Sequence, residues 1–306
     1  MGLLFGESLL AIHTLSALAG SITLIFVCLI TKEFGGKRFA IGLSALGFII
    51  APIWLTINSF CAYDGFDQCI LSILNKKAGS SSEIKPPTAE ALLCYYTAEQ
   101  LRAHFLGLGL GIRSVSFQPK PLNPKAGETD SDPVLKEGNL LSNVFNRAIR
   151  SCFYTAQKYY DGRIPVGNIS GEILKEAKEA ILEYERLMFK CDFHLVMNLM
   201  DIYIRNINKF WTRSIKAAEE SNDDGIRIQV LIDAFHMVRI AAVLMHPIAP
   251  LGTEMVRDYL NLGQEFWDWK RIFEPVYAFM NNPNDHKLKF LEPRVDFFEK
   301  HPSQIG

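Results

Sequence analysis

Charged residues are absent from two long runs near the N-terminus. No Lys, Arg, Asp or Glu occurs in residues 9–31 or in residues 39–60. Each run exceeds the roughly 20 residues that cross a bilayer as an α-helix. A pair of helices buried in a protein core would show the same pattern, but the length of both runs favours a membrane hairpin. A cleaved signal peptide fits less well, because no basic stretch precedes the first run and a second run follows it.

The chain also lacks an excess of positive charge. Its 306 residues include 32 Lys and Arg against 33 Asp and Glu. This balance excludes a strongly basic field over the whole molecule, which many nucleic-acid-binding proteins have. Local basic surfaces remain compatible with it, and one basic stretch is formed by Lys120, Lys125, Arg147, Arg150, Lys158 and Arg163.

Metal-binding patterns are missing as well. The six cysteines include no C-x-x-C pair, and the histidines include no H-x-x-x-H pair. Zinc knuckles and helical zinc sites use such spacings, and a disulfide framework has no support from the spacing either. We therefore expect no metal, no cofactor and a set of reduced, mostly buried cysteines.

The second half of the chain is patterned as helices. Asp132 and Pro133 predict the N-cap and first residue of a helix that reaches Tyr160, where Asp161-Gly162 ends it. Its apolar stripe consists of Leu140, Leu141, Val144, Phe145, Ala148 and Cys152. Further helices are expected over residues 170–189, from 192 to 215 or beyond, and over 224–245 and 251–260. Short connections and no competing strand pattern predict an α-helical bundle.

Three residues of this bundle suit the recognition of unpaired bases. Asn143 and Arg147 lie four residues apart, on one face of the first helix, and Trp211 follows on the third. Asn and Arg hydrogen-bond to base edges, and an indole ring stacks on a base. Taken singly, however, such an Asn and Arg are commonly a solvated helix face, and a single Trp is commonly part of a core.

Residues 75–306, about three quarters of the chain, resemble methionyl-tRNA synthetases, class I enzymes that join methionine to its tRNA. The resemblance rests on the Asn143-x-x-x-Arg147 pair, on Trp211 and on a helix-ending motif at Leu244–Pro250. It implies that Asn143 and Arg147 read anticodon bases, that Trp211 stacks on the anticodon and that a methionine-accepting tRNA is the partner. The family usually has Pro before this Trp, where this chain has Phe210.

A second stretch resembles the Lys-Met-Ser-Lys-Ser loop that closes over ATP in the same family. Its matching residues are Lys77, Ser80, Ser81 and Ser82, while the Met and the second Lys are missing. The resemblance therefore implies a degenerate ATP loop. The His-Ile-Gly-His motif of the ATP- and methionine-binding domain is absent from the sequence. We expect no catalytic residue in this chain and no aminoacylation activity of the chain alone. A separate catalytic subunit that completes the site remains an open alternative.

Residues 1–74 resemble an internal membrane piece of the protein O-mannosyltransferase family. The matching pieces are Leu4–Leu9, Leu15–Gly20, Glu33–Ala40 and Ala51-Pro52, and a third membrane helix of that family is expected to start at residues 68–71. In that family the catalytic Asp lies in a loop before this point, so the resemblance implies an incomplete glycosyltransferase fragment. The cations of the loop at residues 32–38 predict that both ends of the hairpin face outward.

Together these patterns predict an all-α chain: a two-helix membrane hairpin followed by a class I synthetase-type anticodon-binding helix bundle. We expect a hairpin at 1–74, an ATP-loop-like connecting region at 75–131, the anticodon-binding-like bundle at 132–263 and a C-terminal extension at 264–306. Lipid contact is expected through 9–31 and 39–60, and the chain is expected to be membrane-associated. The compartment of 75–306 stays open, and is cytoplasmic if that part binds tRNA.

Three functions fit these expectations. The first is an anticodon-binding fragment that lacks the aminoacylation core. The second is a membrane-tethered protein that localises tRNA or a partner synthetase. The third is a non-catalytic remnant of a membrane glycosyltransferase with an incidental helical tail. Anticodon-dependent RNA binding separates the first two from the third.

Overall fold

The structure is a computed structural model that describes residues 71–74, 76–77, 87–110, 112–127, 129–221 and 223–304. The chain divides into two compact units, residues 1–68 and 69–306. All described residues belong to the second unit. The predicted membrane spans lie outside the described residues, as do Ser80, Ser81 and Ser82 of the ATP-loop-like stretch, and these assignments remain predictions.

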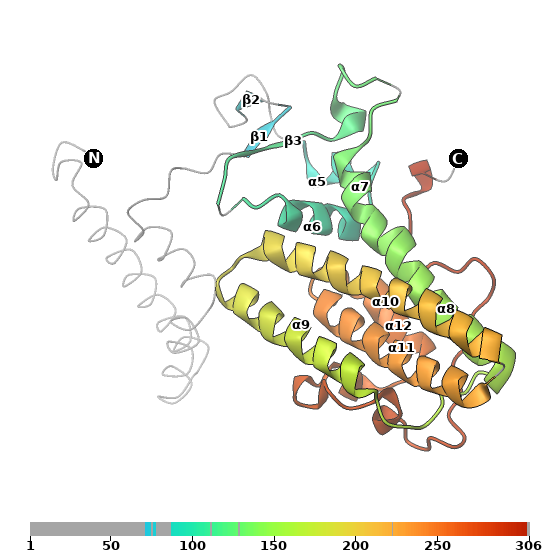
Figure 1. Ribbon diagram of the computed structural model, residues 1–306. Helices are drawn as coiled ribbons and strands as arrows, with labels where there is room; N and C mark the ends of the chain where they lie inside the picture. The colour runs from blue at the N-terminus through green and yellow to red at the C-terminus, as the bar shows by residue number, and fades with distance from the viewer. Residues whose placement is uncertain are drawn as a thin grey trace, which may run out of the picture. The chain divides into compact units, whose positions relative to one another are not determined.

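The described part of the chain is a helix bundle (Figure 1). Its main helices are α8 (Asn146–Tyr160), α9 (Gly171–Phe189), α10 (Phe193–Ser221), α11 (Asp224–Met245) and α12 (Pro250–Tyr259). The central helix α11 packs against the other four, and every residue from 230 to 245 is buried. This arrangement confirms the predicted all-α bundle.

The apolar character of α11 is that of a core helix. Among the described residues it is the one helix that is long and apolar enough to cross a membrane, and 89% of its apolar stretch is buried inside the fold. Burial on all sides removes the need for a polar face, which a surface helix would show.

The helix ends follow from local signals in the sequence. The Asp132 carboxylate accepts the Val134 N–H at 2.9 Å, which confirms the predicted N-cap of α7 (Pro133–Asn139). Asp161 and Gly162 both have positive φ angles, 52° and 73°, and end α8 as predicted. A left-handed conformation at this place costs a glycine little, because it has no Cβ. The predicted bounds of the later helices agree with the structure to within one residue wherever a definite end was given.

A small sheet precedes the bundle and corrects one expectation. It contains β1 (Leu71–Ile73), β2 (Lys76–Lys77) and β3 (Val115–Phe117), with β1 antiparallel to β2 and parallel to β3. The third membrane helix expected at residues 68–71 was therefore wrong at Leu71. Ile73 and Phe117, which are partners in the register of β1 and β3, are the buried residues of these two strands, so this end of the sheet is covered.

The sheet lies beside a second, smaller core. Helices α5 (Ala89–Leu93) and α6 (Ala98–Gly107) begin at the threonine N-caps Thr88 and Thr97. This core is formed by buried residues of β3, three helices and the turn between α5 and α6: Leu92, Tyr96, Leu101, Phe117 and Val134. The Tyr96 hydroxyl donates to Asp132 at 2.6 Å, and burial raises the pKa of this tyrosine. Residues 71–74 thus contribute to the folded body rather than to a membrane segment.

The C-terminal extension wraps around the bundle in short 3₁₀ turns (Figure 1, red). These turns are η3 (Gln264–Trp267), η4 (Trp269–Arg271), η5 (Val276–Phe279) and η6 (Pro302–Gln304). The fully buried Arg239 of α11 holds the first two, because its guanidinium donates to the carbonyls of Phe266 and Ile272 at 3.0 and 2.9 Å. Phe297 and Phe298 near the end are also buried in the main core, so this extension packs on the bundle.

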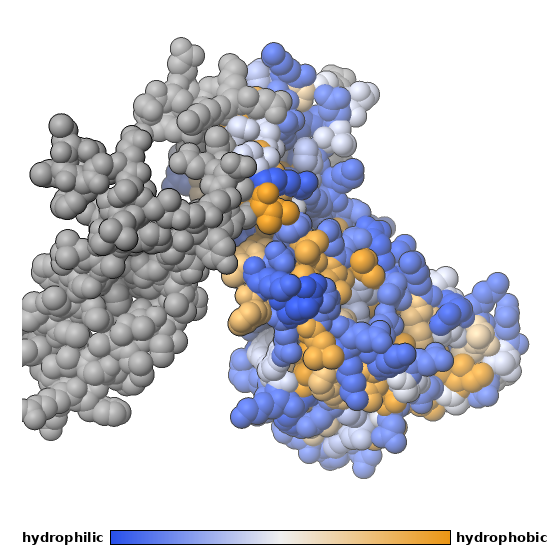
Figure 2. Space-filling model, turned by 60° about the vertical axis from the view of Figure 1, so that its left-hand side comes forward, coloured by the Kyte–Doolittle hydropathy of each residue, from blue (hydrophilic) through white to orange (hydrophobic). Residues whose placement is uncertain are grey.

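The visible surface of the bundle is mostly hydrophilic, with single apolar residues among the charged ones (Figure 2). The most exposed large apolar side chains include Leu182, Phe189 and Ile202 of α9 and α10. Scattered apolar residues of this kind are ordinary on a folded protein. Hydropathy alone therefore does not mark a binding surface on this part of the chain.

His236, on the buried α11, predicts a loss of stability in mild acid. Burial, and next the neighbouring positive charge of Arg239, lower the pKa of this imidazole to about 3. The unfolded chain takes up the proton near pH 6.5 and the folded chain does not, so stability falls as the pH drops below that value. We expect a loss of about 3 kcal/mol between pH 6.5 and 4.

Urea unfolding measured at several pH values checks this expectation. The His236→Leu variant should lose less stability over the same pH interval than the parent chain. His301→Gln is the matched control, since that ring contacts the Ser303 hydroxyl near the chain end. An equal pH dependence in the parent and in His236→Leu would contradict the assignment.

Candidate nucleic-acid interface

The helix that carries Asn143 and Arg147 is interrupted by a wide turn. Between α7 and α8 the segment η2 (Leu140–Phe145) is π-helical, and the Asn146 N–H donates to the Leu141 carbonyl, five residues back. Because a π-turn holds more residues than an α-turn, it rotates the side chains that follow it. Such turns recur at functional sites, where they aim particular side chains.

Asn146 stabilises this turn from inside the protein. The π-turn leaves the Ser142 carbonyl without its ordinary backbone donor, and the Asn146 Nδ2 atom supplies a donor at 2.9 Å. The same amide group holds the C-terminal segment, since its Oδ1 atom accepts the N–H groups of Phe297 and Phe298, both at 3.0 Å. The side chain is completely buried, so every one of these bonds is shielded from water.

Asn208 of α10 connects the turn to Arg147. Its Nδ2 atom donates to the Val144 carbonyl at 2.9 Å, and its Oδ1 atom accepts the Arg147 Nε–H at 3.0 Å. One end of the amide therefore fixes the π-turn and the other end orients the guanidinium. The two terminal nitrogens of Arg147 make no hydrogen bond within the described part of the chain, so they are available for a fork-shaped contact.

The remaining sequence-predicted residues, Asn143 and Trp211, also lie in described helices. Asn143 and Arg147 are both exposed, and the Asn143 side-chain amide donates to the Asn139 side chain. Trp211 follows Asn208 by three residues on α10, which places both on one face of that helix. Trp211 is partly buried against the main core and partly open to solvent. We call Asn143, Arg147, Asn208 and Trp211 the α8–α10 cluster.

The α8–α10 cluster offers the groups that recognise an unpaired base. Arg147 presents donors in a planar fork, Asn143 presents both a donor and an acceptor, and Trp211 presents an aromatic face. Base edges are recognised by the first two kinds of group and base faces by the third. Arg150, the next cation on α8, pairs with Asp296 at 2.8 Å, whereas Arg147 forms no ion pair with an acid in the described part of the chain.

Sequence reasoning missed Asn208 and Asn146, although both leave a signal. Asn208 lies in the apolar stripe of Ile204, Ile207 and Trp211, and Asn146 lies between buried residues of α8. A buried amide must find partners, so an Asn in such a stripe marks a specific contact. The partners themselves lie on other elements and cannot be found from spacing.

The structure does not test the predicted ATP-loop residues as a site. Of these residues only Lys77 lies in a described element, as the last residue of β2, and Ser80, Ser81 and Ser82 lie outside it. Their role therefore stays a prediction. No cluster of potential metal ligands occurs in the described part of the chain, and Cys94, Cys152 and Cys191 are free thiols there.

Comparisons with known proteins point to one group of enzymes. No protein-family model matches the chain. It is 27% identical over 175 residues to a methionine–tRNA ligase of Oceanobacillus iheyensis, covering 53% of this chain and 24% of that protein. It is 20% identical over 175 residues to methionine–tRNA ligase 1 of Alkaliphilus oremlandii, covering 56% of this chain and 30% of that protein. The chain thus spans less than a third of the curated relatives it matches.

Solved structures agree on the fold. The chain matches Mycobacterium tuberculosis methionyl-tRNA synthetase bound by methionyl-adenylate with a TM-score of 0.56 and 16% identity, over 75% of this chain and 43% of that one. The free form of the same enzyme matches with a TM-score of 0.50 and 17% identity, over 69% and 40%. The chain is therefore related in sequence to methionyl-tRNA synthetases over part of its length and shares a helix-bundle fold with them.

Proposed function

We propose that this chain is a methionyl-tRNA synthetase-like fragment that binds tRNA and reads its anticodon through the α8–α10 cluster. The observation that carries the proposal is the Asn208 bridge, which fixes Arg147 beside the face of α10 that bears Trp211. An exposed guanidinium costs side-chain entropy to order, so a buried amide that orders it in advance favours recognition of a ligand. The names of the matched proteins, all of which act on methionine and tRNA, support the same ligand.

We further infer that the chain reads RNA without activating methionine. The sequence lacks the His-Ile-Gly-His motif, and its ATP-loop-like stretch lacks the Met and second Lys that the resemblance calls for. A methionine-dependent exchange of pyrophosphate into ATP by the purified chain would contradict this inference. Aminoacylation of methionine tRNA by a separate methionyl-tRNA synthetase catalytic domain, measured with and without this chain, tests whether activity is supplied by a separate subunit.

Trp211→Ala is expected to weaken binding of methionine tRNA by about 10- to 100-fold. The reason is the loss of one base–aromatic stacking contact, which is worth about 1–3 kcal/mol. Fluorescence anisotropy with labelled tRNA at one fixed salt concentration measures the change. Trp211→Phe should retain most of the affinity, because a phenyl ring also stacks.

Trp269 supplies the matched control for this experiment. It is also partly exposed, but its indole N–H donates to Glu185 on α9, away from the α8–α10 cluster. Trp269→Ala is expected to bind tRNA like the parent chain. Equal weakening in the Trp211 and Trp269 variants would show that general loss of structure, rather than stacking, explains the effect.

A further inference from the structure

A cavity of about 310 Å³ lies between α9 and α10, on a different face of α10 from Asn208 and Trp211. We call it the α9–α10 pocket. Its volume is at the lower end of the roughly 300–1,000 Å³ typical of small-ligand sites. Its lining residues in the described part of the chain belong to these two helices: Glu172, Ile173, Glu176, Asn206, Lys209, Phe210 and Arg213.

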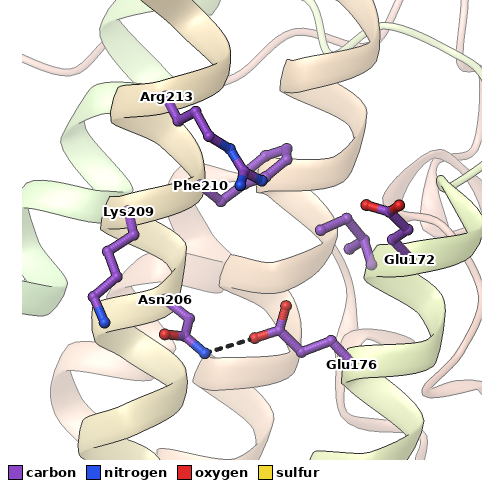
Figure 3. A pocket seen from close by; sticks show the side chains of 7 residues that line it. Glu172, Glu176, Asn206, Lys209, Phe210 and Arg213 are labelled. Atoms are coloured by element: carbon purple, nitrogen blue, oxygen red, sulfur yellow. Dashed lines mark hydrogen bonds between the residues drawn. The ribbon is translucent and has the colours of Figure 1, made fainter.

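The lining separates into an apolar wall and two charged rims (Figure 3). Phe210 forms part of the wall, and Arg213 follows it on α10 (Figure 3). Lys209 and Arg213 supply positive charge from α10, while Glu172 supplies negative charge from α9. Glu176 is already engaged, because its carboxylate accepts the Asn206 amide at 2.9 Å (Figure 3).

The charges that face this pocket lack protein partners. Lys209, Arg213 and Glu172 form no hydrogen bond or ion pair with any other residue in the described ranges. Other arginines of the bundle do pair, among them Arg186 with Glu183 and Arg205 with Asp201. These three charged side chains are exposed to solvent, and together with the ring of Phe210 they border one cavity.

The arrangement matches the chemistry of one nucleotide. A phosphate attracts Lys and Arg, an aromatic ring contacts the face of a base, and a carboxylate accepts a hydrogen bond from an exocyclic amino group. Phe210 and Trp211 flank the buried face of α10 on opposite sides, since successive helix residues are turned by about 100°. An RNA strand bound at Trp211 therefore reaches this pocket by crossing the exposed face of α10, to which Lys209 and Arg213 also belong. A strand that makes this crossing presents its next unpaired nucleotides to the pocket at high effective concentration.

We propose that the α9–α10 pocket binds one unpaired nucleotide of the RNA held by the α8–α10 cluster. Lys209 and Arg213 contact its phosphate, Phe210 contacts its base and Glu172 accepts from its exocyclic amino group. This inference rests on the proposed function, because the strand is placed by Trp211. It adds a second contact point that lies on the α9 side of the helix.

The phosphate contact is tested with the full-length chain and the anticodon stem–loop of methionine tRNA. The double variant Lys209→Gln/Arg213→Gln is expected to bind about tenfold more weakly, with a salt dependence of log K that is shallower by about 1 to 2. Lys216→Gln is the charge-matched control on the same helix, since that lysine lies outside the pocket and pairs with Glu220. Wild-type affinity and salt slope in the double variant would overturn the proposal.

The base contact is tested by replacing each loop nucleotide in turn with an abasic one. At one position the loss of the base is expected to cost the parent chain about tenfold in affinity and to cost Glu172→Ala less, because only the Phe210 contact then remains to be lost. Glu179→Ala, an exposed acid on the same helix, should behave like the parent. Equal costs at every position in the parent and Glu172→Ala would overturn the base contact.

Failure of this inference and failure of the proposed function give different results. If the parent chain distinguishes the native anticodon from a swapped one while the pocket variants bind normally, the pocket is not used and the proposed function stands. If the parent chain ignores the anticodon, the proposed function fails and the pocket inference fails with it.

Discussion

Asn208→Ala is expected to lower the free energy of unfolding by about 2–3 kcal/mol and to weaken tRNA binding by about tenfold or more. The substitution removes the donor of the buried Val144 carbonyl and the acceptor of the Arg147 Nε–H. An unsatisfied buried carbonyl costs about 1–3 kcal/mol, which accounts for most of the stability loss. The affinity falls for a separate reason, because Arg147 must then be ordered when RNA binds.

A double-mutant cycle separates these two effects. Arg147→Ala, Asn208→Ala and the combined variant are compared for tRNA affinity, while urea unfolding of each reports stability. If Asn208 acts by positioning Arg147, its effect on affinity disappears in the Arg147→Ala background. Fully additive losses would contradict the positioning role. Asn198→Ala is the control, since that residue is an exposed asparagine of the same helix.

Asn146→Ala is expected to cost about 3–5 kcal/mol of stability, the largest effect that we predict. The buried amide donates to the carbonyls of Ser142 and Phe298, both at 2.9 Å, and accepts two backbone N–H groups of the C-terminal segment. Alanine fills little of the space and removes all four of these bonds. The stability loss therefore comes from several lost hydrogen bonds rather than from one.

Hydrogen exchange and urea unfolding test this prediction together. The amides of Phe297 and Phe298 should exchange much faster in Asn146→Ala, because the bonds that protect them are gone. Asn143→Ala is the control: it removes an exposed asparagine of the same π-turn and should change stability by less than about 0.5 kcal/mol. Equal destabilisation by the two substitutions would contradict the account of this turn.

The bundle was predictable from local patterns because its helices have clear ends and long apolar stripes. Asp132 and Pro133 start the first helix, Asp161 and Gly162 end it, and α11 begins and ends at the predicted residues. The exposure of Asn143 and Arg147 also follows from spacing, since their apolar neighbours occupy the buried face of the helix. Periodicity thus specifies which face of a helix is buried.

The contacts that shape the candidate site could not be predicted in this way. The π-turn depends on Asn208 of another helix and on a C-terminal segment that lies about 150 residues away from Asn146. Strand β1 was taken for the start of a helix because an apolar run of a few residues has no period of its own, and its partner β3 lies more than 40 residues further on. Long-range partners of this kind decide local structure without leaving a local signal.

The most direct test of the proposed function is the affinity of the full-length chain for methionine tRNA and for the same tRNA with a swapped anticodon, at one stated salt concentration. The account predicts a preference of about tenfold or more for the native anticodon, as expected when base edges are read by a bidentate side chain. Equal, weak binding of both tRNAs that disappears as salt is raised would contradict it, because such binding comes from phosphate contacts alone.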